Sequence, residues 1–235
     1  MSFLTAEWRK LVLANYAIDP TYLQAYLPYG TEIDLWEDRC YLSLVGFMFV
    51  NTRLLGVKIP LHVNFEEVNL RFYVRPQSDP EKRGVVFIKE IVPKPALTLV
   101  ANTFYREHYQ TLPMRHRWSE NQETWQIEYG WKVNQSWQSI SVGADRQALP
   151  IDPQSETAFI TEHYWGYTKI DAHKTFEYQV THPVWEHYPV RDSVIDVDFG
   201  MTYGHIFAFL NELEPVSVML AEGSGITVEK KRILP

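Results

Sequence analysis

The chain has 235 residues, of which 46% are hydrophobic and 22% charged, which is enough for one large all-β or α+β domain spanning residues 1–235. Its 22 basic and 29 acidic residues give a net charge of −7, which argues against nucleic acid or an anionic membrane as the main partner, because both need clustered positive charge. The single cysteine, Cys40, excludes an intramolecular disulfide, and the first residues lack the order of a signal peptide, so we expect a cytoplasmic protein with no membrane span.

A short helix and a hairpin are predicted in the first quarter of the chain. Residues 19–28 start with an Asp-Pro pair and end at Pro-Tyr-Gly, a pattern typical of a short helix. Residues 32–36 and 39–50 should pair as a hairpin, and the second arm is apolar on both faces, as in a covered central strand that packs the Cys40 thiol. Residues 51–63 are expected to form a loop over the surface or over a pocket mouth.

Two strands and a helix follow in immediate succession. Residues 65–75 and 84–92 are predicted to be strands joined by an exposed turn, and a helix should run from Pro95 to Pro113 with apolar residues at three- and four-residue spacings. The other expected elements are strands at 124–129 and 175–181, a long strand or strand pair at 131–142, helices at 155–163 and near 202–212, and a terminal hairpin of 216–221 and 226–232 with its turn at 222–225. About ten strands with two or three helices predict a mostly antiparallel, barrel-like α+β fold.

Several segments resemble the YqjF-like family of uncharacterised bacterial proteins. They are residues 65–75, 83–87 and 112–114, together with Trp8, 18–20, 27–30, 159–164 and 180–185, so the resemblance covers nearly the whole chain. The resemblance implies an acetoacetate-decarboxylase-like fold, a closed β-barrel or cone with a few short helices around an internal pocket for a small molecule.

The same resemblance raises the question of Schiff-base chemistry. In the decarboxylases a lysine forms the Schiff base and a second lysine beside it lowers its pKa. In this sequence the matching position falls near His108, and no lysine occurs between Pro95 and Trp131. Lys89 and Lys94 are the nearest substitutes and have no lysine neighbour, while Lys230 and Lys231 lie in a charged run typical of a solvated surface. Schiff-base decarboxylation is therefore not expected, and no cofactor is implied.

The strand at 65–75 supplies the first group of candidate site residues. Alternation places Val68, Leu70, Phe72 and Val74 on one face and Glu67, Asn69, Arg71 and Tyr73 on the other. If the polar face lines a pocket, Arg71 can bind a carboxylate or phosphate through paired donors, and Glu67 can hold Arg71 or move a proton. If that face meets water, these are ordinary surface residues; the resemblance favours the pocket.

The predicted helix supplies the second group of candidate site residues. Asn102, Tyr105, Arg106 and Tyr109 are spaced three or four apart, so they either line the pocket or pack with their polar groups satisfied; His108 is a second acid–base candidate.

The tripeptide Glu-His-Tyr occurs three times, at 107–109, 162–164 and 186–188, and suggests a metal site. Adjacent Glu and His point in different directions and the separations match no known ligand spacing, so no metal site is expected.

Three classes of function follow. The preferred one is a pocket that binds a small organic molecule, an acid among the candidates, held by Arg71 and oriented by the other polar residues. An alternative is a lysine-independent lyase, isomerase or hydrolase with Glu67 or His108 as acid or base. The third is an interaction or structural protein, since eight tryptophans and an aromatic content of 14% could build the interface of a homo-oligomer.

Overall fold

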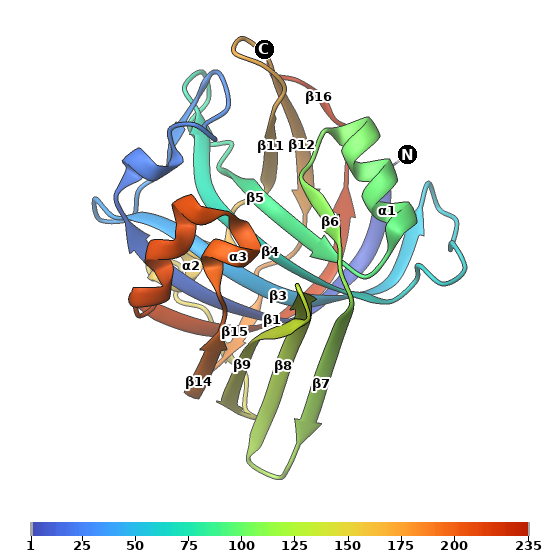
Figure 1. Ribbon diagram of the computed structural model, residues 1–235, viewed down its shortest axis with the longest axis vertical. Helices are drawn as coiled ribbons and strands as arrows, with labels where there is room; N and C mark the ends of the chain where they lie inside the picture. The colour runs from blue at the N-terminus through green and yellow to red at the C-terminus, as the bar shows by residue number, and fades with distance from the viewer. Residues whose placement is uncertain (1, 235) are drawn as a thin grey trace.

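The computed structural model describes residues 2–234, although the side chains of residues 104 and 105 lie outside the described part. The chain forms a 12-stranded sheet that curls on itself, a separate 4-stranded sheet and a few short helices (Figure 1). Pairing is antiparallel except that β5 pairs in parallel with β6 and β11. The mostly antiparallel α+β class is therefore confirmed.

The large sheet contains β1 (Leu4–Ile18), β2 (Thr31–Ile33), β3 (Cys40–Leu54), β4 (Phe65–Pro76), β5 (Gly84–Val92), β6 (Tyr109–Thr111), β10 (Leu149–Pro150), β11 (Trp165–Lys169), β12 (Thr175–Thr181), β13 (Glu186–Tyr188), β15 (Ser217–Val228) and β16 (Arg232–Ile233). The small sheet contains β7 (Met114–Glu120), β8 (Thr124–Val133), β9 (Ser136–Asp145) and β14 (Val190–Asp196). The helices are α1 (Pro95–Val100), α2 (Glu156–Thr161) and α3 (Phe199–Tyr203), the 3-10 helices η1 (Pro20–Leu23) and η3 (His205–Glu212), and the π-helix η2 (Ala101–Tyr105).

The large sheet nearly closes into a ring. Its hydrogen-bonded order includes β15, β1, β3, β4, β5, β11 and β12, and β12 returns to β15 through the pairs Val180–Val228 and Thr181–Thr227. Among the described residues, these two pairs and a hydrogen bond from the Glu229 N–H to the Gln179 carbonyl at 2.9 Å join the ends, so the expected closed barrel is a curled sheet whose ends meet over a short stretch. One face of the sheet is thereby enclosed.

The predicted terminal hairpin is wrong, because β15 continues through the Glu-Gly-Ser-Gly segment and pairs along β1. Gly223 has φ +78°, and a Cβ there would lie 2.1 Å from the backbone oxygen of Trp8. Across from it, β1 is irregular at Lys10, whose φ is 53°. The glycine therefore permits a close strand approach, and no turn forms. The long strand β1 itself was not among the predicted elements.

The predicted helix over residues 95–112 is also wrong in its second half. Helix α1 and the π-helix η2 end at Arg106, which adopts the left-handed conformation with φ 57°. The Asn102 side chain then accepts a hydrogen bond from the Tyr109 N–H at 2.8 Å and donates one to the Tyr109 carbonyl at 2.9 Å. These bonds satisfy the backbone of a segment that leaves the helix and joins the sheet as β6, so strand pairing replaces the last helical turns.

The first predicted elements are confirmed in part. Asp19 caps η1 by accepting from the Thr21 N–H at 2.8 Å, and Ser155 caps α2 by accepting from the Ala158 N–H at 3.2 Å, so both short helices form where capping residues predict them. The 37–38 turn is present as a bridge between Trp36 and Arg39. However, β2 pairs with β4 instead of β3.

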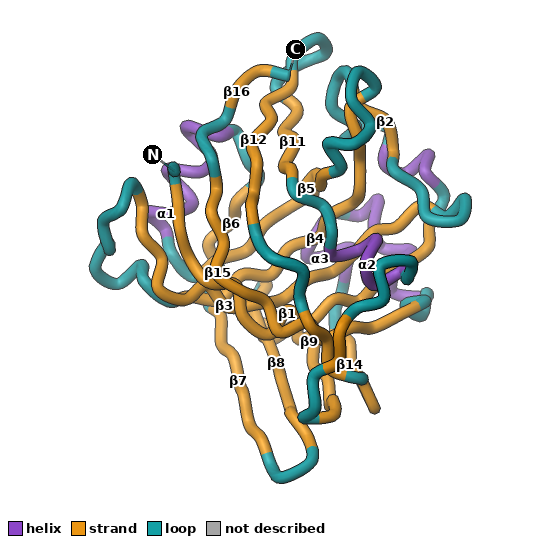
Figure 2. The backbone as a smooth tube through the Cα atoms, turned by 180° about the vertical axis from the view of Figure 1, so that it is seen from behind, coloured by secondary structure: helices purple, strands orange, loops and turns teal. Residues whose placement is uncertain are grey.

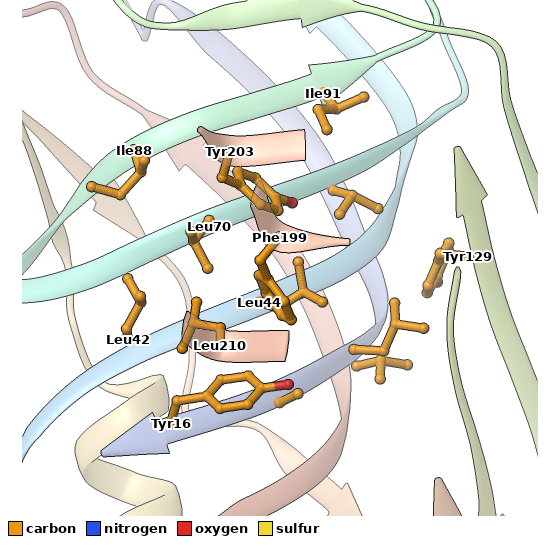
Figure 3. Close-up of a cluster of buried hydrophobic side chains, with 14 of the residues drawn as sticks. Tyr16, Leu42, Leu44, Leu70, Ile88, Ile91, Tyr129, Phe199, Tyr203 and Leu210 are labelled. Atoms are coloured by element: carbon orange, nitrogen blue, oxygen red, sulfur yellow. The ribbon is translucent and has the colours of Figure 1, made fainter. Parts of the chain in front are cut away.

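The outer face of the large sheet is covered by α3, η3 and the small sheet. Figure 3 shows Phe199, Tyr203 and Leu210 packed over Leu44 and Leu70, with further buried side chains around them. Cys40 belongs to the same cluster, and burial raises the pKa of its thiol to about 12, as expected for a packed cysteine. With its outer face packed in this way, the inner face of the curl is left for the site.

Both whole-chain views place α1 beside the start of β1, at one end of the curl (Figures 1 and 2). The small sheet extends from the opposite side of β1 and β3. Within residues 2–234, no helix has the length and apolar character needed to cross a bilayer.

Candidate ligand-binding site

A cavity of about 260 Å³ lies inside the curl of the large sheet. Strands β1, β3, β4, β5, β11 and β12 provide its walls, and α1 and the β3–β4 loop border one end. Ile59, in that loop, lines the cavity and is 40% exposed. The cavity therefore opens to solvent at this end, and the loop forms part of its mouth.

The polar face of β4 faces the cavity. Glu67, Asn69 and Arg71 all line it and are 3%, 1% and 8% exposed. The alternate residues of β4 belong to the core cluster on the other side of the sheet: Val68, Leu70, Phe72 and Val74. Alternation along one strand thus separates a packed face from a face that can bind.

A bulge in β5 places Glu90, and not Lys89, on the cavity side of the strand. The register with β4 shifts between Leu70–Lys89 and Arg71–Phe87, so Ile88 is the extra residue. Phe87 and Glu90 both line the cavity, whereas the Lys89 ammonium donates to the Thr202 carbonyl on the packed side. None of the lining residues in the described part of the chain is a lysine.

The segment after η2 contributes a third carboxyl group and a tyrosine. Beyond the left-handed Arg106, Glu107 is buried and accepts a 2.5 Å hydrogen bond from the Thr168 hydroxyl. Tyr109, opposite Glu90 in the β5–β6 pairing, donates its hydroxyl proton to Glu67 at 3.3 Å. Both residues line the cavity.

Gly166 fixes how the tyrosine on β12 enters the same cavity. A Cβ at Gly166 would lie 2.2 Å from the Tyr178 ring, so only glycine lets that ring lie flat across β11. Tyr178 in turn hydrogen-bonds Glu107. The polar end of the cavity is therefore built from β4, β5, β6, β11 and β12 together.

Burial raises the pKa of each glutamate at this end. It raises the pKa of Glu67 to about 7, although hydrogen bonds from Asn69 and Tyr109 and the charge of Arg71 act in the opposite direction. Burial also raises the pKa of Glu107 to about 7. For Glu90, burial and then the negative charges of the other two carboxyls raise the pKa well above its ordinary value. These carboxyls hold protons at higher pH than exposed ones do.

Arg71 is the cation at this end of the cavity, and no carboxylate forms a close ion pair with it. Its Nε has no hydrogen-bond partner, and none of the ion pairs among residues 2–234 includes it. Asn69 is tied to Glu67 through its Nδ2 at 2.9 Å, which leaves its buried Oδ1 without a partner. Buried polar groups are normally paired, so these two atoms are exceptions that need an explanation.

His163 lies near Arg71, and its imidazole contacts the Asp34 carboxylate. Its Nε2 lies 3.1 Å from Asp34 Oδ2, and Arg83 donates to the same oxygen at 2.6 Å. The other ring nitrogen, Nδ1, is buried and has no partner, and the residue lines the cavity. His163 and Arg71 flank Tyr73, with the imidazole ring 4.7 Å and the guanidinium carbon 5.7 Å from the centre of its ring.

The structure brings together four of the eight residues singled out in the sequence. Glu67, Asn69, Arg71 and Tyr109 share the cavity wall. Three others are exposed and are not among the lining residues: Asn102, Arg106 and His108. The break in the predicted helix explains this, because residues 106–108 form the turn into β6 and Asn102 bonds that segment's backbone. The side chain of Tyr105 lies outside the described residues.

Other site residues were not anticipated. Glu90 could not be predicted because of the β5 bulge: plain alternation from Phe87 would place Lys89 on the cavity side. Glu107 and His163 belong to two of the Glu-His-Tyr tripeptides, but they approach the cavity from different elements and from different positions of the motif. Within the described residues, no cluster of three metal-binding side chains forms. His108 and Glu186 are exposed, so the repeated tripeptide does not mark one common environment.

The family comparison matches most of the chain. The model of the DUF2071 family, described as "Uncharacterized conserved protein", matches residues 5–225. The uncharacterized protein YqjF of Bacillus subtilis is 29% identical over 103 residues, which is 43% of this chain and 41% of the Bacillus protein. The resemblance inferred from the sequence is confirmed.

Solved structures with a similar fold are enzymes. The enduracididine biosynthesis enzyme MppR, complexed with the condensation product of pyruvate and imidazole 4-carboxaldehyde, has a TM-score of 0.67 at 11% identity over 99% of this chain and 90% of its own. The acetoacetate decarboxylase of Legionella pneumophila gives 0.66 at 12% identity over 99% and 87%. An acetoacetate decarboxylase-like enzyme of Sphingomonas wittichii gives 0.67 at 10% over 100% and 94%. At these identities the similarity shows the fold alone.

Proposed function

Because the chain belongs to the DUF2071 family and has an acetoacetate decarboxylase-like fold, we propose that its cavity binds a small organic acid through Arg71, without a Schiff base. The observation that carries the proposal is the buried Arg71 side chain in the cavity wall, whose Nε has no hydrogen-bond partner and which forms no close ion pair with a carboxylate of the described residues. An arginine stays charged in proteins, and a buried charge is costly unless an opposite charge meets it. A carboxylate suits the planar guanidinium, because it can accept two parallel hydrogen bonds.

The glutamates of the cavity are compatible with an anionic ligand. Burial favours the protonated form of Glu67, Glu90 and Glu107, so the negative charge of the site is smaller than three carboxylates suggest. Protonated carboxyls are hydrogen-bond donors as well as acceptors. They can therefore contact a bound acid without repelling it.

The remaining wall indicates the body of the ligand. Trp8, Phe47, Phe49, Phe65 and Leu97 line the cavity together with other apolar side chains. Apolar walls with a few placed polar groups are typical of small-molecule sites, and about 260 Å³ suits a small ligand. We infer an acid with an apolar body that points towards the mouth. Pyruvate, bound by the structurally similar MppR, is likewise a small organic acid.

Titration calorimetry of straight-chain acids from acetate to octanoate, each compared with its neutral amide, tests the proposal. We expect at least one acid to bind more than about tenfold tighter than its amide, since a charged hydrogen-bonded pair is lost in the amide. Arg71→Ala should remove this difference, and Arg117→Ala, which changes an exposed arginine of the small sheet, should retain it. Equal binding of acids and amides by the unaltered protein would contradict the proposal.

A second candidate function is proton transfer on the bound acid by a lyase, isomerase or hydrolase. The observation in its favour is Glu67, whose pKa of about 7 suits a group that takes and returns protons near neutral pH. His108, the other acid–base candidate, is exposed and away from the cavity wall.

Hydrogen exchange measures this activity directly. In D₂O, 2-oxohexanoate should exchange the hydrogens next to its carbonyl faster with the protein than in buffer. Glu67→Gln should abolish that acceleration. No acceleration by the unaltered protein at saturating 2-oxohexanoate would exclude proton abstraction from oxo acids and leave the binding role.

A further inference from the structure

His163 and Asp34 form a buried pair that has no part in the proposed acid-binding role. The pair lies at the cavity wall beside Arg71, where the imidazole packs on Tyr73 and Phe159 at ring distances of 4.7 and 5.0 Å. Only 2% of the His163 side chain and 5% of the Asp34 side chain are exposed. A buried imidazole nitrogen without a partner is costly in a packed interior, so it points to a ligand atom.

The tautomer of His163 follows from the ionisation of Asp34. Burial alone would raise the pKa of Asp34, but the hydrogen bonds from His163 and Arg83 and the charge of Arg83 outweigh it and hold the pKa below its ordinary value. An ionised carboxylate only accepts hydrogen bonds, so the proton in the 3.1 Å contact is on His163 Nε2.

His163 Nδ1 is therefore a buried acceptor without a partner, on a residue that lines the cavity. Burial lowers the pKa of His163 to about 4. The hydrogen bond and charge of Asp34 act in the opposite direction but are outweighed by burial together with the charges of Arg83 and Arg71, so the imidazole is neutral at physiological pH. Its Nδ1 carries a lone pair and no proton. Asn69 presents a second acceptor, because its Nδ2 donates to Glu67 and its buried Oδ1 is unpartnered.

The site thus offers a cation for an acid group and, beside it, acceptors that need a hydrogen donor. We propose that His163, held by Asp34, is a specificity-determining residue that binds a hydroxyl near the carboxylate of the ligand, so that the cavity selects hydroxy acids over oxo acids and unsubstituted acids. The proposal rests on the acid-binding role proposed for Arg71. An oxo group has no proton to donate, and its oxygen would face the lone pair of His163 Nδ1.

Calorimetric titration with four matched probes tests the selection: hexanoate, 2-oxohexanoate, 2-hydroxyhexanoate and 3-hydroxyhexanoate. We expect one of the hydroxy acids to bind about tenfold tighter than hexanoate and 2-oxohexanoate, the size of effect that one buried hydrogen bond gives. His163→Gln, whose amide can still reach Asp34 but has no atom at the Nδ1 position, should lose the preference while it still binds hexanoate. His205→Gln, at an exposed histidine, is the matched control.

The outcomes separate the two proposals. If no straight-chain acid binds better than its amide, the acid-binding role fails and the selection fails with it. If acids bind but the hydroxy acids have no advantage, or if His163→Gln keeps the advantage, only the selection fails.

Nitrogen NMR of the unaltered protein tests the selection even if His163→Gln does not fold. We expect His163 to carry its proton on Nε2 and to have an unprotonated Nδ1, whose signal shifts with the preferred hydroxy acid and not with hexanoate. A protonated Nδ1 in the unliganded protein would overturn the proposal.

Discussion

Replacing Glu67 with glutamine should make the protein more stable at alkaline pH and leave its stability at acidic pH unchanged. The side chain is 3% exposed, and burial raises its pKa from the ordinary 4.5 to about 7. Between these two values the native state holds a proton that the unfolded state has released. The free energy of unfolding of the unaltered protein therefore falls as pH rises through this range.

The magnitude follows from the two pKa values. The rise from 4.5 to about 7 spans about 2.5 pH units, and at 1.36 kcal/mol per unit this corresponds to about 3 kcal/mol. Glutamine has the shape of the protonated carboxyl and can still accept from Asn69 and bond Tyr109. We expect Glu67→Gln to gain up to about 3 kcal/mol over the unaltered protein at pH 8, and the gain to vanish towards pH 4.5.

Urea unfolding followed by tryptophan fluorescence at pH 4.5, 6, 7 and 8 measures this difference. Glu123→Gln, at an exposed glutamate, should give no pH-dependent gain. Glu90 and Glu107 remain in the variant, so a smaller decline with pH should persist. An equal loss of stability at every pH in Glu67→Gln would refute the reasoning, because it would mean that the Glu67 charge is well solvated or paired in the native state.

Four further predictions concern the ligand, the lysines, the wall and the oligomeric state. Arg71→Ala should weaken binding of the preferred acid by more than about tenfold with little change in melting temperature; severe unfolding would make Arg71 structural. Lys89→Ala should leave ligand binding intact, and borohydride with 2-oxohexanoate should trap no adduct, whereas an adduct at Lys89 or Lys94 would restore Schiff-base chemistry. Phe65→Ala, which removes a buried ring stacked 4.8 Å from Phe49, should cost about 3 kcal/mol of stability in urea unfolding and admit longer acids, and unchanged chain-length preference would argue against an apolar tail site. A solution mass measurement tests the interaction-protein alternative, which needs an oligomer that persists without ligand.

The alternation in β4 shows how far the sequence predicts this site. Four polar and four apolar residues at period two are enough to predict the two faces, because strand geometry is local. Which face turns inward depends on the curl of the whole sheet and on the layer formed by α3 and the small sheet. That information is distributed over the chain, and only the family resemblance favoured the inward orientation.

Two local irregularities account for the residues that were missed. The bulge at Ile88 exchanges the faces of Lys89 and Glu90, and strand propensity contains no signal for it. Arg106 ends the π-helix in a left-handed conformation, although three- and four-residue apolar spacing continues to His108. Pairing of β6 with β5 outweighs helix propensity there, so His108 turns outward and Tyr109 turns to the cavity.

Native mass spectrometry tests the central claim, that Arg71 holds a small organic acid in the cavity. The protein and its Arg71→Ala variant are purified in parallel from the native host, and their native and denatured masses are compared. We predict a discrete added mass on the unaltered protein that is released as an acid on denaturation and is missing from the variant. The claim is contradicted if neither protein carries an added mass, or if the same mass stays on the variant.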